Sequence, residues 1–211
     1  MKKKIISKLI FLYYLIPIFL ITGPALPDIA LTLISFFGLY LFFVNYKFLI
    51  NEKILKNYSI FFGIFCLILI IGSFFSFHFK ISFLNSLPFV RFYFFTILIF
   101  FIIFDDYKNI NKILYYILSI IFLVLSLDGI YEYFNNQNLF KTSSLNSHIE
   151  NRISGLFGKE WIIGLYSIKL LPLYVYLFFS GIKKNPYFFS TILFLTYLLI
   201  FLSGERAALI L

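Results

Sequence analysis

Charged side chains that interrupt long apolar runs are the residues of this sequence with the clearest potential for chemistry. Arg91, Asp128 and Lys169 each lie inside such a run, and Arg206 follows the last one. An ionisable group in hydrocarbon costs roughly 2.5 to 3.5 kcal/mol on insertion scales, so it persists mostly where it faces a cavity, a charged partner or a ligand. Guanidinium and ammonium donors stabilise phosphate oxygens most strongly away from water. The cations therefore predict a pocket for an anionic headgroup, a diphosphate above all.

Structural roles also account for these residues. A long arginine side chain such as Arg91 reaches a membrane interface by snorkelling. Lys169 lies too deep for easy snorkelling, and Pro172, three residues on, frees backbone groups beside it. Asp128 is equally well explained as an ion-pair partner, and the sequence leaves that partner open among Arg91, Lys169 and Arg206.

The composition indicates a membrane protein. Of 211 residues, 62% are hydrophobic and 23% aromatic, against roughly 45 to 50% apolar residues in a soluble domain. The single cysteine, Cys66, excludes an internal disulfide framework. With only His78 and His148 as further soft ligands, we expect neither a metal site nor a cofactor.

The net charge of +9 has two explanations. A basic surface is typical of nucleic-acid-binding proteins, because phosphate contacts need it. Lysines in the loops between membrane spans equally well set the orientation of a membrane protein. We favour the second explanation and expect no nucleic-acid partner.

Apolar runs of membrane-spanning length predict an all-α fold, a polytopic transmembrane helical bundle. A span needs about 20 apolar residues, or somewhat fewer where side chains snorkel. Seven runs fit, at residues 5–22, 29–46, 58–77, 87–104, 113–133, 161–181 and 187–204. The longest loop then comprises residues 134–160.

The distribution of basic residues orients the bundle. With the N-terminus in the cytoplasm, the inner loops carry eleven lysines and the outer loops five basic residues, which agrees with the positive-inside rule. The longest loop is then extracytoplasmic, and periplasmic in a bacterium. Arg91, Asp128 and Lys169 lie roughly 6, 8 and 12 Å below the outer surface, at 1.5 Å per residue. Glu205 and Arg206 close the last span on the same side.

Three segments near the C-terminus carry a family resemblance. They read LDGIYEYFNNQNLF, NRISGLFGKEWIIGLYSIKLLPL and FLSGERAALIL. The succession of motifs in these segments resembles the membrane family of O-antigen ligases and related polymerases and oligosaccharyltransferases. In order, the motifs are an Asp before a Tyr-Gln-Tyr-like segment, an Arg-x-Ser-Gly-x-Phe-Gly loop, a basic residue before Leu-Pro, and a helix ending in Ser-Gly-x-Arg. The match runs over residues 128–211, whereas residues 1–127 agree only in helix count and character.

The resemblance implies an activity and its partners. The family transfers a glycan from undecaprenyl diphosphate to an acceptor sugar at the periplasmic face of the bacterial inner membrane, and its ligases act in lipopolysaccharide biosynthesis without a metal. The implied partners are an undecaprenyl-diphosphate-linked glycan, lipid A-core or another sugar acceptor, and membrane lipid.

The resemblance also implies residue roles. It makes Arg206 a diphosphate contact, Arg152 a second basic contact and Lys169 an intramembrane cation near the same site. The positions of Arg91 and Asp128 in the outer half of the membrane add them to the expected substrate-binding set.

The chain departs from the family pattern in two ways. Glu132 stands where the pattern usually has Gln. The family's large periplasmic loop, with its essential His, follows the Ser-Gly-x-Arg helix, so no catalytic residue is assignable and the base is expected beyond Leu211. We therefore expect residues 1–127 to be N-terminal transmembrane helices and residues 128–211 to begin a ligase-like region in an incomplete chain that is inactive alone.

Two other classes fit the same sequence. A transporter or flippase for an anionic lipid or solute also needs buried charges and an interrupted helix, although no clear inverted repeat is present. A non-enzymatic scaffold protein of the membrane would need neither feature.

Overall fold

The computed structural model describes residues 2–44, 52–135, 137, 139, 153–158, 160–180, 184–205 and 208. Within these residues all regular structure is helical and no strand occurs, which confirms the all-α fold class. Four segments are long and apolar enough to cross a membrane: Ala25–Val44, Lys53–Phe74, Phe79–Ile102 and Lys108–Asn135. Leu9–Phe19, Ile163–Phe179 and Pro186–Leu202 are shorter apolar helices. The count of seven spans and the orientation stay predictions.

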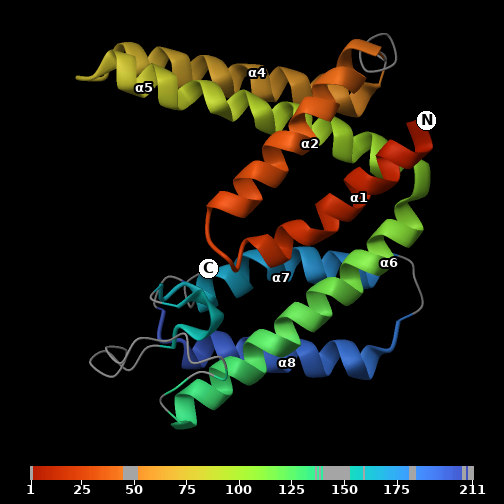
Figure 1. Ribbon diagram of the computed structural model, residues 1–211, viewed down its shortest axis with the longest axis vertical. Coiled ribbons are helices and arrows are strands. Elements are labelled where there is room, and N and C mark those ends of the chain that lie inside the picture. Colours follow the sequence, from red (N-terminus) through yellow and green to blue (C-terminus); the bar gives the residue numbers. More distant parts are fainter. Residues whose placement is uncertain are drawn as a thin grey trace. The chain divides into compact units, whose positions relative to one another are not determined.

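Figure 1 shows the helices in their order along the chain. They are α1 (Lys2–Phe19), α2 (Ala25–Val44), α4 (Lys53–Phe74), α5 (Phe79–Ser86), the 3₁₀ turn η1 (Leu87–Phe89), α6 (Val90–Asn135), the 3₁₀ turn η3 (Gly155–Phe157), α7 (Ile163–Phe179) and α8 (Pro186–Leu202).

Helix α6 is the main difference from the predicted elements. The sequence analysis places a loop between spans at 87–104 and 113–133, whereas residues 105–112 continue the helix. The connecting residues are polar but include neither proline nor glycine, so nothing in them breaks the hydrogen-bond ladder. The polar residues therefore separate two apolar segments of one helix.

Two compact units make up the chain, and each is described by itself. Unit 1 comprises Met1–Ile16 and Pro24–Asp105, and unit 2 comprises Pro17–Gly23 and Asp106–Leu211. Helix α6 contributes its first part to unit 1 and its remainder to unit 2.

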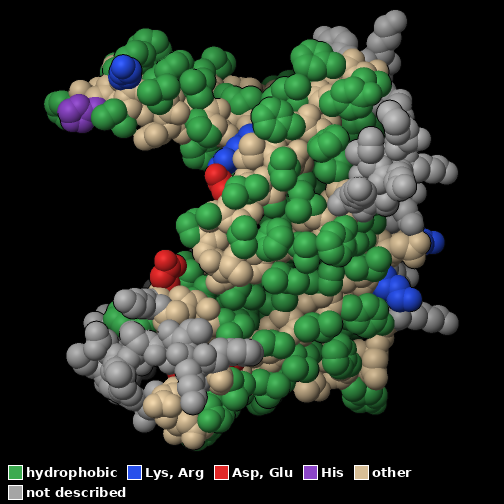
Figure 2. Space-filling view, viewed as in Figure 1, with side chains coloured by type: hydrophobic (Ala, Val, Ile, Leu, Met, Phe, Trp, Pro, Cys, Tyr) green, Lys and Arg blue, Asp and Glu red, His purple; other side chains and the backbone are tan. Residues whose placement is uncertain are grey.

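The exposed side chains are mainly apolar. On α4, Phe61 is 73% exposed, Ile68 62% and Phe74 65%. Hydrophobic side chains cover much of the face seen in Figure 2, with few charged side chains in view. A water-soluble protein rarely exposes so large an apolar area, so these faces fit a hydrocarbon environment.

In unit 1, small and polar residues of α2 pack against the start of α6. The Ser35 hydroxyl donates to the carbonyl of Arg91 at 2.7 Å. A Cβ atom at Gly38 would lie 1.8 Å from the carbonyl oxygen of Phe94, so only glycine fits there. Close backbone approach at small residues is the usual way in which membrane helices associate.

Helix α4 also packs against the start of α6, largely through aromatic rings. Tyr58 and Tyr93 stack with ring centroids 6.0 Å apart. The Ser59 and Tyr93 hydroxyls are 2.8 Å apart, and the Tyr58 and Thr96 hydroxyls 2.9 Å. Each hydroxyl thus finds a partner in an otherwise apolar interface, as buried polar groups require.

The core of unit 2 lies between α6, α7 and α8 and is centred on Tyr174. Its ring stacks on Tyr115 and on Phe189, with centroids 5.1 and 5.4 Å apart, and meets Phe122 edge-on. Its hydroxyl lies 3.2 Å from that of Ser119. One aromatic side chain from α7 therefore joins all three helices.

The contact between α2 and α6 yields a stability prediction. Gly38→Ala should destabilise unit 1 by about 1–3 kcal/mol, because the new methyl group meets backbone rather than a movable side chain. Gly63→Ala is the matched control, since nothing lies within 4 Å of a Cβ at Gly63 on α4; it should be neutral or stabilising by up to about 1 kcal/mol. Thermal unfolding in detergent, followed by circular dichroism, measures both. Equal effects of the two substitutions would contradict the close packing of α2 on α6.

Candidate functional site

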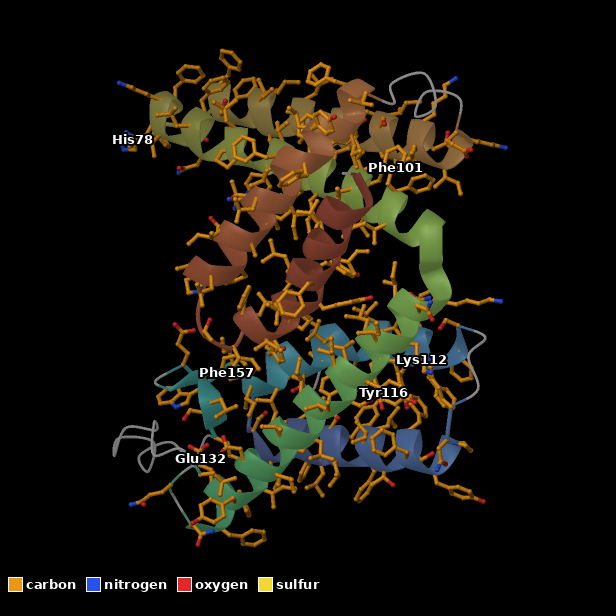
Figure 3. The ribbon with its side chains drawn as sticks, turned by 45° about the vertical axis from the view of Figure 1, so that its right-hand side comes forward. His78, Phe101, Lys112, Tyr116, Glu132 and Phe157 are labelled. Carbon is orange, nitrogen blue, oxygen red and sulfur yellow. The ribbon has the colours of Figure 1, made fainter. Side chains whose placement is uncertain are left out.

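Three buried carboxyl groups define a polar end of unit 2, which we call the carboxylate end: Asp128, Glu132 and Glu205. Their residues are 0%, 4% and 9% exposed. Asp128 and Glu132 lie one turn apart on the last part of α6, and Glu205 follows α8. Figure 3 shows Glu132 at the same end of the unit as Phe157 of η3. A buried charge is costly unless it is hydrogen-bonded, so each carboxyl needs donors.

Glu132 holds the turn that leads into η3. Its Oε1 accepts from the amide and the hydroxyl of Ser154 at 3.3 and 3.2 Å, and its Oε2 accepts from the Gly155 amide at 2.6 Å. Ser154 is right-handed helical and Gly155 has a φ of +55°, an alternation that directs successive N–H groups to one point and binds anions. The occupant of this anion-binding turn is the chain's own carboxylate.

Glu205 holds the first turn of α7. Its Oε1 accepts from the Gly164 amide at 2.8 Å and its Oε2 from the Leu165 amide at 2.9 Å. The first N–H groups of a helix have no partner within the helix, and the helix dipole favours a negative charge at that end. The carboxylate therefore satisfies two free donors and matches the dipole.

Asp128 has the fewest donors of the three. Its Oδ1 accepts from the Leu139 amide at 2.9 Å, whereas its Oδ2 is buried and has no hydrogen-bond partner among the described residues. A Cβ at Gly155 would lie 3.3 Å from this oxygen and 2.6 Å from Cδ1 of Ile163. Oδ2 therefore lies beside the backbone of Gly155.

Close contacts hold the three helices together at this end. A Cβ at Gly164 would lie 2.4 Å from the Ser203 hydroxyl oxygen, and one at Gly129 would lie 2.3 Å from Cδ1 of Leu199. The glycines thus let α7 and α6 approach α8 closely. The phenol of Tyr166 donates to the carbonyl of Pro17 at 2.6 Å, which attaches the end of α1 to the same unit.

Arg91 has a carboxylate partner within unit 1. Its Nη1 donates to Asp28 Oδ2 at 3.0 Å and to the Thr32 hydroxyl at 3.3 Å, and its Nη2 bonds the other oxygen of Asp28. The Arg91 and Asp28 side chains are 27% and 55% exposed. A two-point contact of this kind fixes geometry as well as charge, so Asp28 occupies the part of the guanidinium that an anionic ligand would use.

Lys169 does not join the carboxylate end. It is exposed, whereas the buried residues of α7, among them Ser167, Leu171 and Tyr174, form the opposite face of the helix. The helix continues through Pro172. No ion pair among the described residues joins Lys169 to Asp128. Two further predicted site residues, Arg152 and Arg206, lie outside the described residues.

Lys184 lies at the opposite end of α7. Its ammonium donates to the carbonyl of Leu177 and sits over the Tyr115 ring, with Nζ 4.4 Å from the centroid. Burial lowers the pKa of this ammonium. A cation at the C-terminal end of a helix complements its dipole.

The sequence analysis missed the roles of Asp28, Glu132 and Glu205. Asp28 stands just before the span predicted at 29–46. A carboxylate at the start of a helix is favoured by the helix dipole, so its position in the sequence could have indicated its role. In the described part of the chain, no three His, Cys, Asp or Glu side chains gather as metal ligands would.

Comparison of the chain with protein-family models, with curated proteins and with solved structures finds no match. The resemblance of residues 128–211 therefore depends on the three motif segments themselves.

Glu205 yields a prediction about the start of α7. Glu205→Gln keeps one acceptor oxygen but presents an NH₂ group to the second amide, so we expect a loss of about 1–3 kcal/mol. Amide hydrogen exchange at Gly164 and Leu165 should become roughly tenfold faster or more. Exchange measured by mass spectrometry in nanodiscs tests this. Glu160→Gln, which changes an exposed carboxylate shortly before α7, is the control and should leave the exchange unchanged.

Proposed function

We propose that this chain is part of a bacterial inner-membrane glycosyltransferase that moves a glycan from undecaprenyl diphosphate to an acceptor, as the O-antigen ligases of lipopolysaccharide biosynthesis do. One observation carries the proposal. The three segments that resemble this family are separate in the sequence, and hydrogen bonds join them at the carboxylate end. Glu132 links the first segment to the second at Ser154 and Gly155, and Glu205 links the third to the second at Gly164.

The backbone donors at the carboxylate end do not account for binding of the proposed diphosphate. The backbone donors of the Ser154 turn and of the first turn of α7 already bind carboxylates. A diphosphate therefore needs side-chain cations, for which we propose Arg152 and Arg206. Lys169 is not assigned to this site, because it lies on the exposed face of α7. We give Arg91 an interhelical role instead, because Asp28 occupies its guanidinium.

The proposed chemistry is displacement at the anomeric carbon with inversion. Cations stabilise the charge that develops on the departing diphosphate. A general base takes the proton of the acceptor hydroxyl, and no described residue is assigned to that role. The acceptor is lipid A-core or another sugar.

A transporter or flippase for an anionic lipid is the second candidate. The observation that favours it is Asp128, a fully buried acidic residue within an apolar segment. Ionisable residues in such positions often mark ion or proton pathways in transporters.

Complementation tests the proposed enzyme. In a strain that lacks its O-antigen ligase, the gene that encodes this chain should restore surface glycan, and Arg206→Ala and Arg152→Ala should each reduce it at least roughly tenfold, because each removes a proposed charge-assisted contact to phosphate. Lys80→Ala, which removes an exposed lysine on the same predicted side, should have no effect. The readout is the lipopolysaccharide banding pattern at matched protein level. Wild-type glycan from both site variants would overturn the cationic site.

Thiol labelling tests the orientation. In a Cys66→Ser background, a membrane-impermeant maleimide should label Glu160→Cys in intact spheroplasts but Tyr187→Cys only after permeabilisation. Both positions are exposed, and they flank α7 and its connection to α8. The reverse pattern would place the carboxylate end in the cytoplasm and rule out a periplasmic reaction.

A further inference from the structure

The three carboxyl groups of the carboxylate end differ in their donors. Glu132 accepts from two amides and a hydroxyl, and Glu205 accepts from two amides, so every one of these four oxygens has a donor. Asp128 accepts from one amide at Oδ1, while Oδ2 has no partner in the described structure. Donors aimed at both oxygens stabilise an ionised carboxylate, and Asp128 lacks them.

The position of Asp128 also disfavours a negative charge. The residue is 0% exposed, and a Cβ at Gly155 would contact both its free oxygen and the aliphatic end of Ile163. An isolated charge in such surroundings is costly enough that the group becomes neutral instead. Glu132 lies one helical turn away, and two neighbouring carboxylates repel each other. The one ion pair found among the described residues joins Arg91 to Asp28 in unit 1, so it does not compensate Asp128.

We propose that Asp128 is a neutral carboxylic acid that carries its proton on Oδ2, and that this O–H group donates a hydrogen bond to a phosphate oxygen of the ligand. The second part depends on the proposed function. An ionised aspartate would repel a diphosphate, whereas a neutral acid is a donor and removes that repulsion. Deliberate placement of a neutral acid as a donor is a known use of an apolar site.

Gly155 forms the wall next to this donor. Gly155 has no side chain, and a Cβ atom there would contact both Oδ2 and Ile163. The same glycine donates its amide to Glu132. Oδ2 is buried, so a ligand reaches it only if neighbouring groups move.

Infrared spectroscopy tests the protonation state directly. The full chain in nanodiscs at neutral pH should show the C=O stretching band of a protonated carboxylic acid, and Asp128→Asn should remove it. Glu205→Gln should leave this band in place, because both oxygens of Glu205 already accept from backbone amides. A wild-type spectrum without the band, or a band that survives in Asp128→Asn, would overturn the proposal.

Ligand binding tests the donor. Trp161 is the chain's single tryptophan and stands two residues before α7, so its fluorescence reports a titration with undecaprenyl diphosphate in phosphatidylcholine nanodiscs. Asp128→Asn keeps a neutral donor and should bind within about twofold of wild type, whereas Asp128→Leu should bind roughly tenfold to hundredfold more weakly. Ser126→Ala is the control and should bind as wild type does. It removes a hydroxyl group of α6 that, like Asp128 Oδ2, is buried without a hydrogen-bond partner among the described residues.

The two measurements distinguish a failure of the proposed function from a failure of the roles proposed for Asp128. A wild-type chain that shows the infrared band but binds no diphosphate lipid would overturn the proposed function and the donor role, and would leave the neutral acid established. Equal binding by Asp128→Asn and Asp128→Leu, with wild-type binding intact, would overturn the donor role alone. Thermal unfolding of Asp128→Leu verifies that the variant is folded.

Discussion

The satisfaction of backbone donors and acceptors at helix ends is the constraint on which unit 2 depends. Where hydrocarbon replaces water, an unpaired N–H or C=O group costs several kcal/mol. Helix α7 meets this requirement with a side chain at each end: Glu205 binds the amides of Gly164 and Leu165, and Lys184 donates to the carbonyl of Leu177. The negative charge lies at the N-terminal end and the positive charge at the C-terminal end, so both also match the helix dipole. Because these residues flank α8, the position of α8 determines both ends of α7.

Unit 1 is held together differently. Its helices meet through a glycine, hydroxyl groups and aromatic rings, and its ion pair joins two side chains rather than a side chain and a helix end. Asp28 nevertheless lies in the first turn of α2, where a carboxylate also matches the dipole. Arg91 thus ties α6 to the start of α2. Arg91 therefore has a structural role and is a poor site for an anionic ligand, because its charge is already balanced by a carboxylate.

Hydropathy was sufficient to predict the helical class and most apolar segments, because a run of about 20 apolar residues is a local property. It failed at residues 105–112, where polar residues suggested a loop but nothing in them breaks a helix. The site was harder to predict. Asp128 was identified from its cost in hydrocarbon, yet the roles of Glu132 and Glu205 depend on which backbone amides come near them, and those amides lie 22 to 41 residues away. Lys169 was expected at membrane depth near the site, and its place on the exposed face of α7 depends on which face of that helix meets α6 and α8.

The charge of the carboxylate end decides what it can bind. Three ionised carboxylates would repel an anionic ligand, but the three acidic residues differ in how their charges are compensated. Glu132 is matched by the converging amides of the Ser154 turn and Glu205 by the α7 dipole, and with Asp128 neutral, as proposed above, no uncompensated negative charge is left there. The cations proposed for the ligand are close in sequence to the two matched carboxylates, since Arg152 stands two residues before Ser154 and Arg206 directly follows Glu205. Glu132 and Glu205 bind the backbone of segments that adjoin these two arginines in the sequence, so the two carboxylates have partners other than the proposed cations.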